Sequence, residues 1–368
     1  MSGVTTLSPT LSFYIAKRFL VSFAIVMLGL CTIIFLIDII ELMRRTSSRA
    51  DVSVALLTQM ALLKLPYMAQ KIVPFATLFG GMHTFSRLTR FQELVVARSA
   101  GISAWQFLLP AVGSMMIIGV INVAAFNPLA SAMLSRYDRL EEKLVIGQTN
   151  MLAMSRTGLW LRQADDIGQA VIHAASVTQP DLVLRGVVIF IYEGSDKFIN
   201  RIDAAEARLG DGVWLLKSVL LTAPGQPPQS LPTYEVKTDW TLEKIQDSFA
   251  APETMSFWDL PGFIKLLDNA GFSANRHRLY WHSLLSVPAM LAAMVLIAAS
   301  FSMRSSRRGG TAALIGGGVL FGFLLFFLSD VVLALGLSAS IPAILAAWTP
   351  AGFSLLLGLA AMLHLEDG

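Results

Sequence analysis

Six long apolar segments, in two groups of three on either side of about 145 mostly polar residues, constrain this chain most. An apolar run of about 20 residues is long enough to cross a bilayer as a helix. The 368 residues are 55% apolar but only 14% charged, whereas soluble proteins average about 25% charged residues. The deficit comes from the apolar blocks. The pattern therefore predicts a membrane protein with one water-facing insert.

The six predicted spans are 19–40, 54–67 continued by 72–85, 104–126, 279–301, 312–335 and 341–363. The second is the least regular, because Pro66 interrupts it. We expect its first part to lie at the interface, with Lys64 and Lys71 reaching toward water. The predicted parts are 1–130 for spans one to three, 131–255 for the insert, 256–275 for an amphipathic connecting helix and 276–368 for spans four to six.

Basic residues in short loops orient a membrane protein toward the cytoplasm. They gather at three sites on one side of the six-span arrangement: Lys17 and Arg18; Arg87, Arg90 and Arg98; and Arg304, Arg307 and Arg308. We therefore expect both termini in the cytoplasm and the insert, with 15 basic and 18 acidic residues between 131 and 278, on the outer side. Arg44, Arg45 and Arg49 lie against this rule, either without consequence or opposite an anionic partner.

The insert changes to short, alternating segments between 158 and 237, punctuated by Gly, Asp, Asn and Pro. Seven or more strands at this spacing predict an all-β sandwich or jelly roll. Its edges either accept strands from a partner or are protected within a self-contained domain. Residues 256–269 predict an amphipathic helix that leads back to the membrane.

Several kinds of chemistry have no motif in this chain. A GxxxxGK[ST] phosphate loop, HExxH, CxxC and GxSxG are all missing, and the five histidines lack metal-ligand spacing. A formal charge of +3 is too small to indicate nucleic-acid binding. Two aspartates, Asp38 and Asp330, lie near span ends. They are hydrated helix-end residues, partners of arginines at the outer face, or, least favoured, an aspartyl protease dyad.

The loop 87–103 carries the sharpest local pattern, and we expect it to form a short amphipathic helix that ends at Gly101. Leu88, Phe91, Leu94 and Val95 make its apolar stripe; Arg87, Arg90, Glu93 and Arg98 make its polar part. Such a helix either lies on lipid or docks into a cytoplasmic motor subunit.

Several stretches resemble one family. They are PFATLFGGMHTFSRLTRFQELVVARSAGIS at 74–103, YIAKRFL and LIDIIEL in the first span, GLWLR at 158–162 and the segment 322–351. All resemble the lipopolysaccharide-export permease family of the Lpt ABC transporter, and the last two are closer to its G member than to its F member. The resemblance covers nearly the whole chain.

This resemblance implies a six-helix permease half with a periplasmic β-jelly-roll, in the bacterial inner membrane. It implies a heterodimer with a sister permease on a cytoplasmic ATPase dimer, which would bind ATP and Mg²⁺, so that this chain binds no cofactor or metal and is not itself an enzyme. The implied partners are lipopolysaccharide, a bitopic jelly-roll subunit and a periplasmic bridge protein, with no nucleic acid.

The resemblance also implies site residues. Those coupling to the ATPase are Arg90, Phe91, Glu93, Leu94 and Arg98. Arg136 and Arg139 either bind the substrate, since arginine binds phosphate through paired hydrogen bonds, or are ordinary interfacial residues. We add Arg44, Arg45 and Lys64 as further candidates for binding the substrate. Phe35 stands where the family's first helix leads us to expect a basic residue. Trp160, Val188, Phe190 and Trp214 either line a lipid path in the insert or are sandwich core.

Two further alternatives remain open at this point. A non-transporting membrane scaffold with an outer protein-binding domain has the same pattern of spans. The small residues Gly316, Gly317, Gly318 and Gly322 of the fifth span either permit a close contact with the sister permease or allow tight packing within one subunit.

Overall fold

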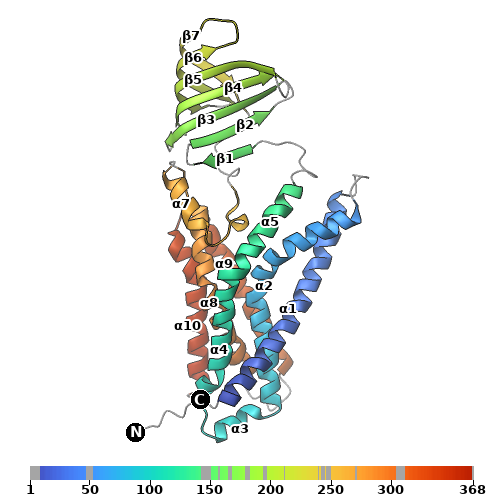
Figure 1. Cartoon of the computed structure of the whole chain (residues 1–368). Helices are drawn as coiled ribbons and strands as arrows, with labels where there is room; N and C mark the ends of the chain where they lie inside the picture. Colours follow the sequence, from blue (N-terminus) through green and yellow to red (C-terminus); the bar gives the residue numbers. More distant parts are fainter. Residues whose placement is uncertain are drawn as a thin grey trace. The chain divides into compact units, whose positions relative to one another are not determined.

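The computed structural model describes residues 9–46, 53–141, 151–155, 158–164, 168–178, 183–193, 197–210, 212–238, 240–241, 245, 250–269, 272–303 and 311–366. The chain forms two compact units. The helical unit comprises residues 1–137, 256–258 and 278–368, and the β unit comprises residues 138–255 and 259–277. Both are drawn in Figure 1.

The helices are α1 (Pro9–Thr46), α2 (Val54–Arg90), α3 (Glu93–Ser99), α4 (Ala104–Ile121), the π-helix η1 (Asn122–Phe126), α5 (Asn127–Glu141), α7 (Leu260–Asn269), α8 (Asn275–Ser302), α9 (Thr311–Leu337) and α10 (Ala343–Glu366). Within the described residues, five helical segments are long and apolar enough to cross a membrane: α1, α4 to α5 taken together, α8, α9 and α10. The second predicted span, α2, does not meet that criterion.

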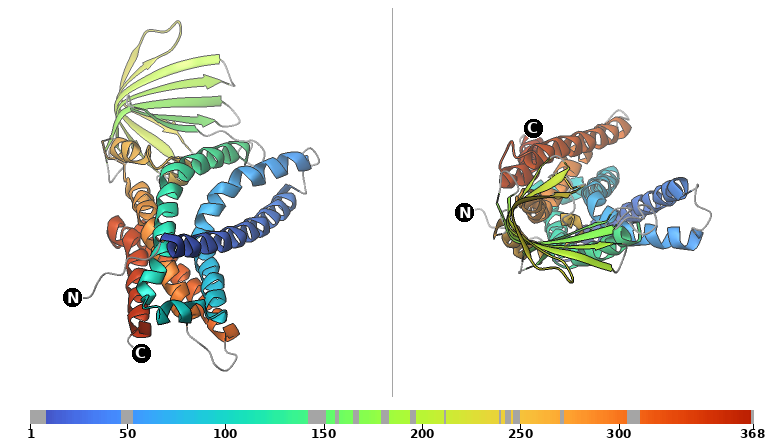
Figure 2. Two further views of the ribbon diagram at one scale, coloured as in Figure 1. Left: turned by 60° about the horizontal axis from the view of Figure 1, so that its bottom comes forward. Right: turned by 90° about the horizontal axis from the view of Figure 1, so that it is seen from above.

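The predicted break in the second span is wrong. Residues Val54–Arg90 form one helix with Pro66 and Pro74 inside it. A proline removes one backbone hydrogen bond and crowds the preceding turn, which bends a helix without necessarily ending it. Figure 2 shows this effect, because the first part of α2 is inclined to the remainder.

The third predicted span also continues beyond its expected end at residue 126. It becomes a five-residue π-helix, Asn122–Phe126, and then α5, which extends to Glu141. Pro128 lies in the first turn of α5, and its missing N–H and bulky ring disturb the α-helical bonding of the residues before it. The segment therefore stays helical but changes its hydrogen-bond register.

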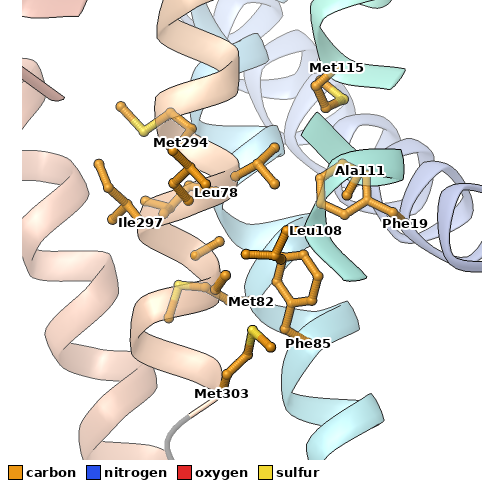
Figure 3. Close-up of a cluster of buried hydrophobic side chains, with 14 of the residues drawn as sticks. Phe19, Leu78, Met82, Phe85, Leu108, Ala111, Met115, Met294, Ile297 and Met303 are labelled. Atoms are coloured by element: carbon orange, nitrogen blue, oxygen red, sulfur yellow. The ribbon is translucent and has the colours of Figure 1, made fainter. Parts of the chain in front are cut away.

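The core of the helical unit is a cluster of buried side chains, mostly from α1, α2, α4 and α8, with single residues from α3, α9 and α10. Figure 3 shows Phe19, Leu78, Phe85 and Leu108 among its members, with their side chains directed toward one another. Two glycines of the fifth predicted span pack inside this unit. A Cβ at Gly318 would lie 2.5 Å from Met82, and one at Gly322 would meet Leu78. Tight packing within one subunit thus accounts for these two glycines.

The β unit holds one antiparallel sheet of seven strands in sequence order. The strands are β1 (Met151–Ser155), β2 (Gly158–Ala164), β3 (Gly168–Thr178), β4 (Val183–Glu193), β5 (Lys197–Leu209), β6 (Val213–Thr222) and β7 (Gln229–Lys237). This sheet fits the expected inserted β domain. β1 lies before residue 158, where the alternating segments were expected to begin. The described strands form a curved meander (Figure 2), and the jelly-roll topology remains a prediction.

Residues 256–269 were predicted as one amphipathic helix, but only Leu260–Asn269 are helical, as α7. Leu260, Ile264 and Leu267 form its buried stripe. Residues 256–258 belong instead to the helical unit. We call residues 256–258 the hook.

Candidate substrate and motor-coupling sites

We call residues 87–103 the coupling segment. Its short helix begins later than predicted. Arg87 and Arg90 belong to the last turn of α2, and the chain then turns at Gln92, whose φ of 60° is left-handed. The short helix α3 covers only Glu93–Ser99. Gly101 follows its C-cap residue, Ala100, and has the left-handed φ of +83° expected of a terminating glycine. Hydrogen bonds from Ile102 N to Ala97 O and from Gly101 N to Arg98 O close a Schellman motif.

The apolar stripe of this segment divides into two groups. Leu88 and Leu94 are buried in the core cluster of the helical unit. Phe91 and Val95 are exposed, together with Val96, at 63%, 59% and 66%. The buried leucines anchor the segment, while the other three side chains present an apolar surface, which we call the α3 patch.

The polar residues of the segment have different roles. Glu93 accepts a hydrogen bond of 2.9 Å from the Tyr14 hydroxyl of α1, so it connects α3 to the first helix. Arg87 lies over the ring of Phe91, 5.7 Å from its centroid. Arg90 and Arg98 are exposed. Of the predicted coupling residues, Arg90, Phe91 and Arg98 are thus exposed. Glu93 binds α1, and Leu94 is the buried anchor.

Lys64, a predicted substrate ligand, is engaged with another side chain. Its ammonium donates to Asp38 of α1 over 2.6 Å, and both side chains are mostly buried. The Lys64 ammonium also lies 5.4 Å from the ring centroid of Tyr137. The lysine therefore joins α1, α2 and α5. Asp38 is neither a hydrated helix-end residue nor an arginine partner, because a lysine pairs with it.

The other acidic and basic candidates lie on surfaces. Arg44 and Arg45 both bind the carboxylate of Glu41 on α1, over 2.9 Å and 2.8 Å. Asp330 is exposed on α9, and among the described side chains no hydrogen bond joins it to Asp38. Nothing in this arrangement favours a protease dyad. Arg49, Arg304, Arg307 and Arg308 lie outside the described residues.

Arg136 and Arg139 are exposed on α5, three residues apart. Side chains at this spacing lie on one side of a helix. Between them, Tyr137 is buried and provides the ring beneath Lys64. Arg136 of α5 and Lys64 of α2 are thus carried by two helices that the Lys64–Tyr137 contact joins.

The four predicted lipid-path residues do not share one face of the sheet. Trp160 pairs with His173 and His173 with Val188, so these three side chains lie on one face, with Phe190 two residues further along β4. The rings of Trp160 and His173 are 4.3 Å apart. Trp214 is fully buried on the opposite face, with Leu161, Ile189 and Val219. The sequence does not distinguish these faces, because bulges change the alternation of the strands.

The face of the sheet that carries Trp160 and Phe190 also carries an ion pair. Arg201 binds Asp203 over 2.6 Å and lies 5.7 Å from the ring centroid of Phe190. The hydrogen bond from Arg201 to the Asp203 carboxylate raises the pKa of that guanidinium above its ordinary value. Arg201 thus remains charged at any physiological pH.

Sequence reasoning missed a polar cluster at the π-helix. Gln70 of α2 donates to the carbonyl and the side-chain oxygens of Asn122, both over 3.2 Å. Asn127 donates to Gln70 over 3.4 Å. The sequence signal that could have predicted this cluster is the presence of two asparagines and a proline at the end of an apolar run. Among the described residues, no group of three or more His, Cys, Asp or Glu side chains is placed to hold a metal ion.

Comparison with known proteins agrees with this architecture. Residues 13–364 match the family model described as lipopolysaccharide export system permease LptF/LptG. The chain is 24% identical over 304 residues to LptG of Escherichia coli K12, covering 81% of this chain and 82% of the relative. It is 24% identical over 302 residues to LptG of Haemophilus influenzae, covering 78% and 80%. Since the family model covers almost the whole chain, the protein belongs to the LptF/LptG family of lipopolysaccharide export permeases.

Proposed function

We propose that this chain is the G-type permease half of an ABC transporter that extracts lipopolysaccharide from the inner membrane and passes it to a periplasmic bridge. The family match supports the export role, and the α3 patch supports coupling to a motor. In this proposal the chain pairs with a sister F-type permease, and a separate cytoplasmic ATPase dimer binds ATP and Mg²⁺. A bitopic subunit receives the lipid from the β unit.

The proposed membrane topology has six spans: the five helical segments that are long and apolar enough to cross a membrane, and α2 in addition. Its 37 residues correspond to about 55 Å of helix, which exceeds the ~30 Å of a bilayer core. Pairing of Lys64 with Asp38 lowers the cost of placing either charge near lipid. With six spans, both termini face the cytoplasm and the insert, with its proposed jelly roll, faces the periplasm.

The single observation that carries the motor role is the division of the coupling segment. Leu88 and Leu94 hold it in the core, so a push on the α3 patch moves the helices rather than only the loop. The Tyr14–Glu93 hydrogen bond passes such a push to α1. An apolar surface exposed at about 60% is also what a partner interface buries.

The substrate site of the proposal uses the cations of α1, α2 and α5. Arg136 and Arg139 are exposed, and an anionic lipid headgroup offers the phosphate oxygens that guanidinium groups bind best. Arg44 and Arg45 keep their partner Glu41 until such a group replaces it. Acyl chains need an apolar path, for which the buried face with Trp214 is better suited than the exposed face with Trp160.

Two matched experiments test this function. Val96→Asp places a charge on the α3 patch, and Leu220→Asp makes the same change at an exposed leucine of the sheet. Only Val96→Asp should prevent co-purification of an ATPase and stop growth. If both variants retain the ATPase, the motor role is wrong and a non-transporting scaffold is favoured.

A photo-crosslinker at Leu216, on the buried face of the sheet, should capture lipopolysaccharide only during ATP turnover. The matched position is Trp160 on the other face, which should capture little. Capture at Leu216 without ATP, or equal capture at both positions, would count against this lipid path.

A further inference from the structure

The helix that carries Arg136 changes direction at the π-helix. Figure 2 shows α5 inclined to α4, and the change coincides with Asn122–Phe126. In an α-helix, the carbonyl of Ala124 would accept from the N–H of residue 128. Residue 128 is proline and has no N–H to donate. The sequence therefore leaves the Ala124 carbonyl without its helical donor.

The hook supplies the missing donor. The indole Nε1 of Trp258 donates to Ala124 O over 3.0 Å, although the Trp258 side chain is 62% exposed. The backbone N–H of Phe257 donates to Asn127 Oδ1 over 2.8 Å. The Phe257 ring stacks on Trp281 of α8, with 6.0 Å between ring centroids. Two hydrogen bonds and one stacked ring thus hold the hook to the π-helix and to α8.

The other side of the π-helix is held by α2. Gln70 binds Asn122 at both oxygens and accepts from Asn127, and both asparagines are buried. One turn before the π-helix, α4 is packed tightly on α8. A Cβ at Gly119 would lie 2.7 Å from the Cα of Pro288. α4, before the π-helix, is therefore fixed by packing. The direction of α5, after the π-helix, depends on these polar contacts.

We propose that Trp258, Asn127 and Gln70 are positioning residues that set the direction of α5 and thereby aim Arg136 at the anionic headgroup. This inference rests on the proposed function, since it concerns the same substrate site. Collapse of a π-helix to an α-helix moves one residue out of the bulge. The helix beyond it would rotate by about 100° and shift by about 1.5 Å along its axis. Such a rotation carries Arg136 away from its present side of α5.

The test uses a tryptophan pair that differs in one hydrogen bond. Trp258→Phe keeps an aromatic ring and removes the N–H that binds Ala124 O. Trp281→Phe is the matched control, because it keeps an aromatic ring against Phe257 and removes a buried Nε1 that has no hydrogen-bond partner. Asn127→Leu combined with Trp258→Phe removes both hydrogen bonds of the hook. Asn127→Asp in place of Asn127→Leu retains an acceptor for Phe257 N and should restore much of the loss.

The first readout needs no substrate. Cys31 is the chain's single cysteine, so a Cys31→Ser background allows spin labels at Arg136→Cys on α5 and Leu28→Cys, an exposed position on α1. We expect the label–label distance to shift by several ångströms or broaden in Trp258→Phe, and to stay unchanged in Trp281→Phe. The same distance in both variants would overturn the proposal.

The second readout is capture of lipopolysaccharide by a photo-crosslinker at position 136. Capture should fall several-fold in Trp258→Phe and remain in Trp281→Phe. Changed distances with no capture in any variant would refute the proposed function but leave the positioning role standing. Equal capture in both variants with unchanged distances would refute the positioning role alone. If Trp258→Phe does not fold, Gln70→Leu with the same two readouts decides the question.

Discussion

Replacing Asp38 by asparagine removes one charge from the pair that joins α1 to α2. The Lys64 ammonium lies 2.6 Å from the Asp38 carboxylate, with side-chain exposures of 22% and 14%. Asparagine keeps the shape and one oxygen acceptor, so the change isolates the charge. The ammonium would then remain mostly buried without its counter-ion, beside the ring of Tyr137.

The size of the effect follows from this partial burial. Exposed ion pairs contribute about 0–1 kcal/mol, and breaking a fully buried pair costs about 3–5 kcal/mol. The Asp38–Lys64 pair lies between these limits, so we expect Asp38→Asn to lower the free energy of unfolding by about 1–3 kcal/mol. Lys64→Met should cost a similar amount, since it leaves the Asp38 carboxylate unpaired.

A double-mutant cycle measures the pair directly. Unfolding in mixed detergent micelles, followed by tryptophan fluorescence, gives the free energy for wild type, both single variants and Asp38→Asn with Lys64→Met. The double variant leaves no unpaired charge, so it should be destabilised less than the sum of the singles, with a coupling of about 1–2 kcal/mol. Additive losses, with a coupling under about 0.3 kcal/mol, would refute a direct interaction.

Three further variants test other contacts. Gly119→Ala should lower thermal stability in detergent by about 1–3 kcal/mol, because its Cβ would press on α8, while Gly113→Ala, which meets open space, should be neutral; equal effects would contradict the packing. Tyr14→Phe removes the hydroxyl that binds the α3 carboxylate and should cost about 1.5–3 kcal/mol locally, seen as weaker stimulation of the co-purified ATPase; unchanged stimulation would argue against transmission through α1. Trp214→Ala should destabilise the chain by about 3–5 kcal/mol in a proteolysis assay, and Trp160→Ala much less; the reverse order would contradict the burial of the two rings.

The arrangement of elements was largely predictable from local patterns. Hydropathy located the long helices, since burial of apolar side chains in lipid needs a continuous run. Alternation identified the strands of the insert, and Gly101 marked the end of α3 because few other residues adopt its backbone conformation. Local prediction failed where two signals conflicted. Pro66 predicted the end of a helix, and the apolar run of the third span ended at residue 126, but both segments continue as helix.

By itself, the sequence determined where the chain is apolar, where it alternates and where its basic loops lie, because these properties depend on residues close together in the chain. Only the tertiary structure decided which distant side chains meet. Lys64 pairs with Asp38, Glu93 accepts from Tyr14, and Trp258 replaces the donor that Pro128 lacks. Each of these contacts satisfies a charged or polar group, and helix packing decides its partner across tens of residues of sequence.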